Sequence, residues 1–186
     1  MALVILLLRT GGNPRTAFTS LTKALKDGAE LSGMIYALLI GASIFTLFMT
    51  MAKVPQGLSS FVTGLPIPPT LTVLLVLLTL IPLGMFLDGF SILLVMVPLI
   101  HPIVVTDLGF DGVWFAILVV KCIELGLMTP PVGLNVFVTA GAVKGLSPAT
   151  VFRGVTPFFL IDLVGIAVMF LFPEIITFLP NLMFGN

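Results

Sequence analysis

An apolar stretch near the middle of the chain is interrupted at residues 126–135, which read Gly-Leu-Met-Thr-Pro-Pro-Val-Gly-Leu-Asn. Pro130 and Pro131 lack backbone donors, and proline disfavours the helical conformation of the residue before it. Within a membrane, interrupted backbone is tolerated only where protein surrounds it or where it lines a polar cavity. Secondary transporters bind substrates and coupling ions at such breaks, whereas the plainer alternative is a proline kink in a packing helix.

The amino-acid composition indicates that this stretch lies in a membrane protein. The 186 residues are 59% hydrophobic and 9% charged, whereas a soluble domain has about 25% charged residues. Long apolar runs separated by Gly and Pro predict an all-α integral membrane protein in contact with the lipid bilayer, rather than a barrel. The formal net charge of zero offers no basic field, so no nucleic-acid partner is expected.

The chain divides into an N-terminal segment and a transmembrane domain. Residues 1–30 form the first, and apolar side chains at helical spacing predict an amphipathic interfacial helix within it. Residues 31–186 form the transmembrane domain. Its predicted parts are a span over 31–52, an interfacial piece over 55–65, a re-entrant hairpin over 70–105, a broken helix over 112–144, a last span over 155–173 and a C-terminal segment over 174–186.

The predicted hairpin over 70–105 depends on a second interruption. Residues 84–91 read Gly-Met-Phe-Leu-Asp-Gly-Phe-Ser between two apolar arms. Each arm has roughly 13 or 14 residues, which is short for a bilayer core that needs about 20 residues per helix. These lengths predict a re-entrant hairpin with its tip at 84–91. The alternative extends both arms through the tip and gives two tight spans.

The distribution of Lys and Arg predicts how the chain is oriented in the membrane. Under either alternative for the hairpin, Lys53 lies on one side of the membrane and a group of cations lies on the other. The positive-inside rule makes the side with the larger group cytoplasmic. The members of that group are Arg9, Arg15, Lys23, Lys26, Lys144 and Arg153.

Asp88 is the charged residue of the predicted tip. A carboxylate within the membrane is costly, so it should face a cavity or a partner. Its oxygens suit backbone donors of the tip or a bound cation. The structural alternative is that Asp88 caps the helix that begins near Gly89 or Phe90.

Other charged residues lie close to the break. Lys121 and Glu124 are three positions apart on the helix that leads into it, a spacing that permits an ion pair. A compensated intramembrane pair is the preferred interpretation, and contact with substrate or ion is the alternative. Asp162 lies in the last span, and no partner for it follows from the sequence. Asp111 and Ser147 suit the capping positions of the helices that follow them.

The chain lacks the residue patterns of catalysis. It contains one His and one Cys, and it has no phosphate-binding glycine loop and no nucleophile elbow. We therefore expect neither enzyme activity nor a cofactor.

The break can nevertheless supply oxygen ligands for Na⁺. Prolines free backbone carbonyls, and the C-terminal end of a half-helix adds partial negative charge. The Asn135 amide can assist, and a half-helix that begins near Leu134 would point its positive end at an anionic substrate. The candidate sodium ligands are Gly126, Thr129, Pro130 and Gly133.

Several motifs resemble those of one transporter family. They are the sequence Gly-Met-Phe-Leu-Asp at 84–88 and the break at 126–135, with further similarity at 40–43, 54–56, 147–148 and 155–158. Together they resemble the large membrane (DctM-like) subunit of tripartite ATP-independent periplasmic (TRAP) transporters. The resemblance covers roughly residues 16–180 and corresponds to the C-terminal half of that subunit.

The resemblance implies a fold and a function. The fold is one inverted-repeat half of an ion-transporter-like elevator, with a re-entrant helical hairpin and a broken transmembrane helix. The function is Na⁺-coupled import of organic acids, C4-dicarboxylates or sialic-acid-like anions, through the bacterial cytoplasmic (inner) membrane. The implied partners are a periplasmic substrate-binding protein, a small membrane subunit and the missing N-terminal half of the permease.

The resemblance also assigns roles to individual positions. The sodium site corresponds to the break at 126–135, and the hairpin tip or substrate site corresponds to a second group of residues. That group consists of Gly84, Asp88, Gly89, Ser91 and Asn135. The alternative function is a truncated, non-transporting membrane fragment or an assembly partner of a separately encoded first half.

Overall fold

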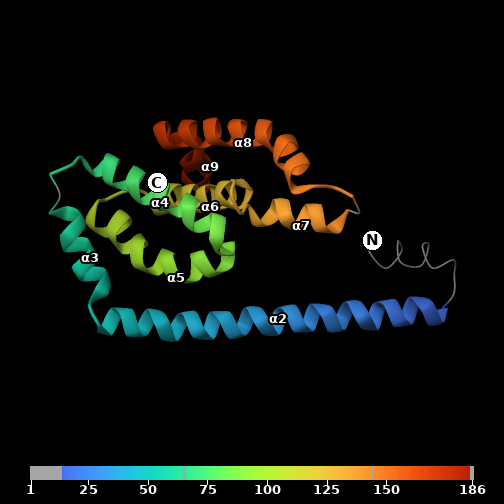
Figure 1. Cartoon of the computed structure of the whole chain (residues 1–186). Coiled ribbons are helices and arrows are strands. Elements are labelled where there is room, and N and C mark those ends of the chain that lie inside the picture. The colour runs from blue at the N-terminus through green and yellow to red at the C-terminus, as the bar shows by residue number, and fades with distance from the viewer. Residues whose placement is uncertain (1–13, 65, 144, 185–186) are drawn as a thin grey trace. The chain divides into compact units, whose positions relative to one another are not determined.

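A computed structural model describes residues 14–64, 66–143 and 145–184, and the regular elements in these ranges are all helices (Figure 1). This confirms the predicted all-α class. The elements in chain order are α2 (Pro14–Met51), α3 (Val54–Thr63), α4 (Pro69–Phe86), α5 (Gly89–His101), the π-helix η1 (Pro102–Asp107), α6 (Gly112–Met128), α7 (Leu134–Ala142), α8 (Pro148–Leu171) and α9 (Glu174–Phe184).

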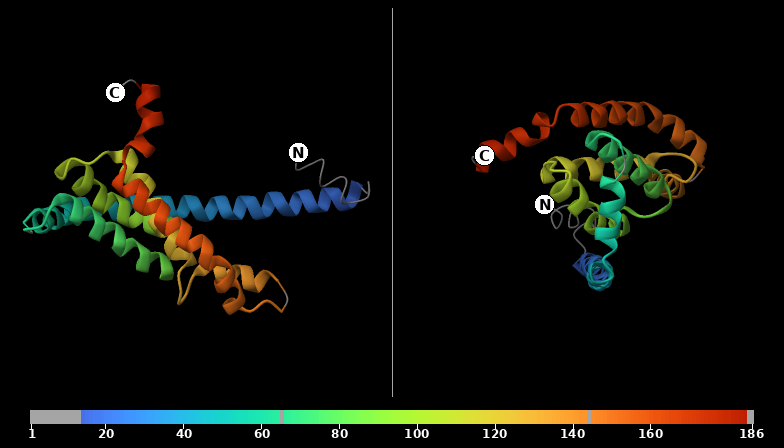
Figure 2. Two further views of the ribbon diagram at one scale, coloured as in Figure 1. Left: turned by 90° about the horizontal axis from the view of Figure 1, so that it is seen from above. Right: turned by 90° about the vertical axis from the view of Figure 1, so that its left-hand side faces the viewer.

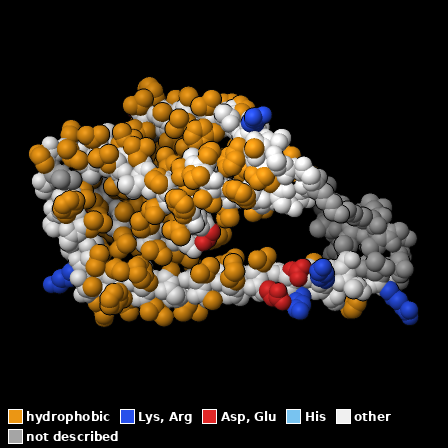
Figure 3. Space-filling view, in the orientation of Figure 1, with side chains coloured by type: hydrophobic (Ala, Val, Ile, Leu, Met, Phe, Trp, Pro, Cys, Tyr) orange, Lys and Arg blue, Asp and Glu red, His pale blue; other side chains and the backbone are white. Residues whose placement is uncertain are grey.

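Helix length and surface composition fit a membrane protein. Many large apolar side chains are exposed, and hydrophobic side chains cover most of the face seen in Figure 3. Such a surface is stable in lipid and costly in water. Within the described ranges, four helical segments are long and apolar enough to cross a membrane: Phe18–Met51, Pro69–Phe86, Gly89–Asp107 and Pro148–Leu171.

The chain forms two compact units, Met1–Ser43 and Ile44–Asn186. The first unit is described from Pro14 on and consists of the N-terminal part of α2. Although an interfacial helix and a separate span are predicted there, α2 is one continuous helix of 38 residues. Residues 1–13, with Arg9, and the predicted end residues at 65 and 144 lie outside the described part of the chain.

The second unit is organised around α6, which contacts α4, α5, α7, α8 and α9 (Figure 2). A helix surrounded on several sides must be apolar over most of its circumference. α6 meets this requirement and contributes more residues to the hydrophobic core than any other described helix. Its buried residues are Trp114, Phe115, Leu118, Val119, Cys122, Ile123, Leu125 and Gly126.

α4 and α6 cross with their backbones in contact. A Cβ atom on Gly84 would lie 2.8 Å from the carbonyl oxygen of Ile123. A Cβ atom on Gly126 would lie 2.5 Å from the carbonyl oxygen of Ile81. Glycine is required at both positions because any side chain would push the two helices apart.

The two arms that precede and follow Asp88 are longer than the sequence predicts. α4 has 18 residues, and the apolar helical segment Gly89–Asp107 has 19. Helical structure continues through Gly84 to Phe86 and resumes at Gly89, so only Leu87 and Asp88 separate the helices. The arm-length argument for a re-entrant hairpin is therefore wrong, because both arms are long enough to cross a membrane.

Candidate functional site

The predicted interruption of the central helix is present. α6 ends at Met128 and α7 begins at Leu134, so residues 129–133 separate two half-helices. The peptide bond between Pro130 and Pro131 is cis. Gly133 has a φ of +49°, a left-handed conformation that side chains disfavour, and it occupies the position before α7.

Proline changes the hydrogen bonding at the end of α6. The carbonyls of Gly126 and Leu127 would normally accept from the residues four positions later, but those residues are the two prolines. Gly126 accepts from the Thr129 backbone N–H instead, at 3.0 Å. The Thr129 hydroxyl donates to the Leu125 carbonyl at 2.6 Å. The hydroxyl oxygen and these carbonyls retain lone pairs that can coordinate a cation.

Asp88 caps α5, as its structural alternative predicts. Its Oδ1 accepts from the backbone N–H of Ser91 at 3.0 Å, and its Oδ2 accepts from the Ser91 hydroxyl. This arrangement satisfies donors at the start of a helix. Ser91, a predicted tip residue, therefore holds the carboxylate of Asp88 in a defined orientation.

The turn before α5 and the start of α7 meet at one cavity. Its volume is about 520 Å³, and α6 forms the wall between the two segments. Polar groups from three distant parts of the chain reach it: Asp88, Glu124 and Asn135. The remaining lining residues are Gly89, Phe90, Leu93, Val120, Ile123, Leu127 and Leu134.

The other predicted site residues lie outside this lining. Gly84 and Gly126 occupy the crossing of α4 and α6, and Thr129 and Pro130 lie in the break. A Cβ atom on Gly133 would lie 3.1 Å from the ring of Phe152 on α8. The structure thus brings Asp88 and Gly89 together with Asn135 at the cavity, and it packs the predicted ion-site glycines Gly126 and Gly133 tightly against neighbouring atoms.

A network of three charged residues connects α6 to α8. Lys121 Nζ lies 2.8 Å from Glu124 Oε2 and 2.6 Å from Asp162 Oδ1. The side chains of Lys121 and Asp162 are 27% and 19% exposed, whereas that of Glu124 is 51% exposed. Asp162 Oδ2 is buried and has no hydrogen-bond partner among the described residues. The Lys121–Glu124 pairing is as predicted, and Lys121 is also the partner of Asp162 that the sequence did not reveal.

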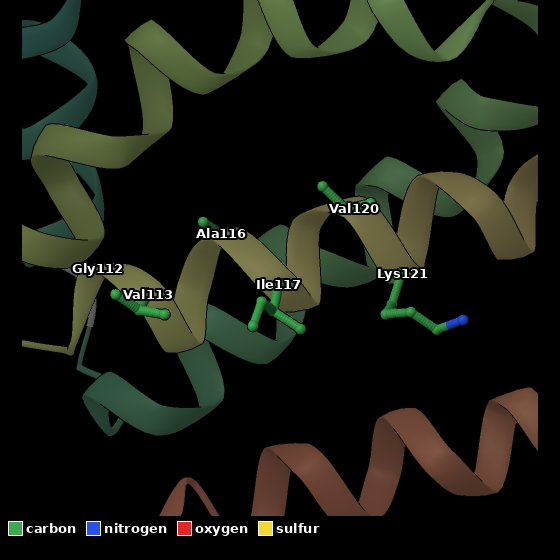
Figure 4. A pocket seen from close by; sticks show the side chains of 6 residues that line it. All are labelled: Gly112, Val113, Ala116, Ile117, Val120 and Lys121. Carbon is green, nitrogen blue, oxygen red and sulfur yellow. The ribbon is translucent and has the colours of Figure 1, made fainter. Parts of the chain in front are cut away.

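A second, apolar cavity of about 430 Å³ follows one face of α6 (Figure 4). Val120 borders both cavities, so this face leads toward the turn before α5. In Figure 4 the Lys121 side chain extends from α6 on the side of α8. The lining residues are Gly112, Val113, Ala116, Ile117, Val120 and Lys121.

Three residues that line the break or the cavity were not predicted from the sequence. Phe152 packs against the break, and Leu93 and Ile123 line the cavity beside Asp88. They are ordinary apolar side chains in apolar helices, and no local pattern distinguishes a cavity wall from a lipid-facing surface.

Comparison with known proteins gives a consistent assignment. The family model of the tripartite ATP-independent periplasmic transporter DctM component matches residues 1–175. The large permease protein of the C4-dicarboxylate TRAP transporter of Pseudomonas aeruginosa is 34% identical over 159 residues, which cover 86% of this chain and 37% of that protein. The corresponding Vibrio cholerae protein is 33% identical over 160 residues, which cover 86% of this chain and 33% of that protein.

A relative that is named for a different substrate also matches. The large permease protein of the sialic acid TRAP transporter of Vibrio cholerae is 27% identical over 161 residues, which cover 87% of this chain and 37% of that protein. The chain thus spans about a third of the length of these relatives. Because the family model matches nearly the whole chain, the chain belongs to the DctM family of TRAP transporter large permeases, multi-pass proteins of the bacterial inner membrane that are transporters rather than enzymes.

Proposed function

We propose that this chain supplies the C-terminal half of the large permease subunit of a Na⁺-coupled secondary transporter for organic acids. The observation that carries the proposal is the cavity beside the broken helix, where the turn before α5 meets the start of α7. Family membership supplies the transporter class. Discontinuous helices near the bilayer midplane are the usual binding elements of such transporters.

The coupling ion binds at the C-terminal end of α6. The carbonyl of Gly126 and the hydroxyl of Thr129 supply hard oxygen ligands, and the Pro130 carbonyl completes the set. The carbonyl of Gly133, the remaining candidate, already accepts from the backbone N–H groups of Val136 and Phe137 at the start of α7. The end of a helix adds partial negative charge there. A cation therefore finds favourable electrostatics without a carboxylate in its coordination shell.

The organic acid binds in the cavity beside this ion site. The first residues of α5 and of α7 both line the cavity, including Gly89 and Asn135. Asp88 caps α5, whereas Gly133 before α7 has no side chain to cap that helix. The N-terminus of α7 therefore keeps partial positive charge and free N–H groups, which suit a substrate carboxylate. The relatives are described as C4-dicarboxylate and sialic acid permeases, and these anions are the substrate classes proposed here.

The position of the turn supports a re-entrant hairpin on grounds other than arm length. Gly84, near the end of α4, contacts Gly126 three residues before the break. α6 and α7 have 17 and 9 residues, which correspond to about 25 Å and about 14 Å of helix. A break that lies within a crossing of this length is inside the bilayer, and the turn at Leu87 and Asp88 is close to it in depth.

The complete transporter has the organisation that the family implies. This chain forms one inverted-repeat half of an elevator fold, and the N-terminal half of the permease completes the substrate site. A small membrane subunit and a periplasmic substrate-binding protein are the further partners. The binding protein delivers the organic acid, and the sodium gradient drives its import.

Reconstitution tests the proposal. The chain is combined with the N-terminal half of the permease, the small subunit and the binding protein in proteoliposomes, and uptake of radiolabelled succinate or sialic acid is measured. We expect uptake only with all components and only with an inward Na⁺ gradient, not with K⁺. Thr129→Val removes one oxygen ligand and should raise the half-saturating Na⁺ concentration about tenfold, or about 1.4 kcal/mol of binding free energy.

Thr139→Val is the matched control. Thr139 donates to the carbonyl four residues earlier, at 2.7 Å from Asn135 O, as Thr129 does at the end of α6. Because Thr139 lies in the regular part of α7, its loss should leave the sodium dependence unchanged. Sodium-independent uptake, or an unchanged sodium response in Thr129→Val, would contradict the proposed site.

A further inference from the structure

α8 runs alongside both halves of the broken helix. It contacts α6 and α7, and Figure 1 shows it following the two half-helices past the break. Three sets of contacts define this arrangement, and their order along α8 is the reverse of their order along α6 and α7. α8 is therefore antiparallel to the broken helix over its whole length.

The first contact lies near the C-terminal end of α8. The Trp114 indole N–H donates to the carbonyl of Met169 at 2.9 Å. Four residues after Met169 the chain has Pro173, which has no N–H for this carbonyl. Phe110 and Phe170 pack on the indole ring, with ring centroids at 5.4 Å and 5.5 Å.

The second contact is the ion pair between Lys121 and Asp162. Its two atoms are 2.6 Å apart, and both side chains are mostly buried. The pair lies one turn before Glu124, which borders the cavity at the break. An ion pair in apolar surroundings has one favourable geometry, because any displacement exposes unpaired charges to a low dielectric.

The third contact lies beyond the break. Phe152 packs against Gly133 and forms an edge-to-face contact with Phe137 of α7, with ring centroids at 6.3 Å. α8 is thus fixed to α6 by polar contacts and to α7 by aromatic ones. No backbone hydrogen bond of a regular helix joins α6 to α7 across residues 129–133, so their relative placement depends on neighbours such as α8.

We propose that α8 is a brace across the helix break and that Lys121 and Asp162 are positioning residues for the coupling ion. The ion pair fixes how far α6 is shifted along α8. Phe152, on the same helix α8, packs against Gly133 and Phe137 and thereby fixes the position of α7 relative to α6. The brace itself is independent of the proposed function, whereas its effect on the ion rests on that function. Asp162 is expected to act through Lys121 and to make no contact with the ion or the organic acid.

Distance measurements between spin labels test the brace in the purified chain. The buried Cys122 is replaced by Ala, and labels are attached at Ile117→Cys on α6 and Val138→Cys on α7, both exposed positions. We expect one narrow distance distribution for the parent protein in lipid nanodiscs. Asp162→Asn, which keeps the shape of the side chain, should at least double its width, and Lys121→Met should broaden it further.

Two further variants control for charge and folding. Exchange of the pair, Lys121→Asp with Asp162→Lys, keeps one ammonium and one carboxylate at the contact between α6 and α8 and should restore the narrow distribution. Lys26→Met removes a Lys–Glu pair with a 3.7 Å separation in α2 and should leave the distribution unchanged. Trp114 is the only tryptophan, so its fluorescence reports whether α6 and α8 remain packed in each variant.

Sodium titration of uptake in the reconstituted transporter tests the effect on the ion. Asp162→Asn should raise the half-saturating Na⁺ concentration about tenfold while maximal uptake changes less than twofold, and the exchanged pair should recover most of this loss. Unchanged label distances in Asp162→Asn and Lys121→Met would overturn the brace. Altered distances with unchanged sodium affinity would overturn the positioning role, and uptake without any sodium dependence in the parent would overturn the proposed function instead.

Discussion

The two flanks of α6 are built differently. Toward α4, Gly84 and Gly126 let the backbones touch, and the contact is apolar. Toward α8, the apolar side chains of Ile166, Met169 and Phe170 pack against the core only partly buried, and two polar contacts join the helices: an indole hydrogen bond to the Met169 carbonyl and an ion pair to Asp162. All residues of α8 are described and none is buried, whereas α4 contributes several residues to the core.

The two flanks therefore have different roles: one packs two helices tightly together, and the other fixes the position of one helix along another. Where the backbones of α4 and α6 touch, many atoms make favourable dispersion contacts, and neither Gly84 nor Gly126 can be replaced by a residue with a side chain. No residue of α8 is fully buried, but its hydrogen bond and its ion pair each have a preferred direction and therefore fix the register of α8 against α6. We infer that α4 and α6 move as one body, while α8 determines how α7 is placed against it.

Gly126→Ala should have the largest effect on stability. The added Cβ atom meets the backbone oxygen of Ile81 at 2.5 Å, which no side-chain rotation can relieve. We expect a loss of about 3 kcal/mol in the free energy of unfolding, the upper range for overpacking. Gly165→Ala on α8 is the control, because nothing lies within 4 Å of its Cβ position. Thermal unfolding in detergent compares the two, and equal midpoints would contradict the difference between the flanks.

Trp114→Phe should have the next largest effect. Phenylalanine keeps an aromatic ring between Phe110 and Phe170 but leaves the Met169 carbonyl without its indole donor. The expected loss is about 2 kcal/mol, the cost of an unsatisfied polar group. Because this variant has no tryptophan, circular dichroism follows its unfolding. A midpoint unchanged from the parent would show that the α8 flank does not need this bond.

Asp111→Ala should have a smaller effect, since it acts on α6 alone. Asp111 Oδ1 accepts from the Trp114 backbone N–H at 2.8 Å, as an N-cap does. We expect a loss of about 1 kcal/mol, typical of a removed N-cap. Hydrogen exchange of the first turn of α6 should increase while the α4 crossing stays protected. Increased exchange throughout α4 would instead indicate that the cap also supports that flank.

Lys26→Met should have the smallest effect. The side chains of Lys26 and Glu30 are 77% and 67% exposed, and their charged atoms are 3.7 Å apart. Pairs of this kind contribute about 0.3 kcal/mol. The unfolding midpoint should therefore stay within about 1 °C of the parent for a domain of this size. If the midpoint shifted as much as in Trp114→Phe, exposed and buried polar contacts would contribute equally to stability. The comparison of the two flanks of α6 assumes that they do not.

Local sequence determined the helix ends and the break. Asp88, Asp111 and Ser147 cap the helices that follow them, because each side chain accepts from a backbone N–H three residues later. The paired prolines end α6 because they remove donors that the preceding carbonyls need. These effects act within one turn of chain, so the residues that cause them are adjacent in the sequence. The apolar composition likewise identified a membrane protein without reference to any contact.

Tertiary structure alone decided which helices meet and through which atoms. The partner of Asp162 is Lys121 on another helix, and the glycines at 84 and 126 serve a backbone crossing. The length of α4 also depended on it, since Gly84 remains helical where it packs against α6. Such pairings depend on crossing angles and register between helices that are similar in composition. A sequence of uniformly apolar helices leaves those angles open, and only the packed backbone selects one set.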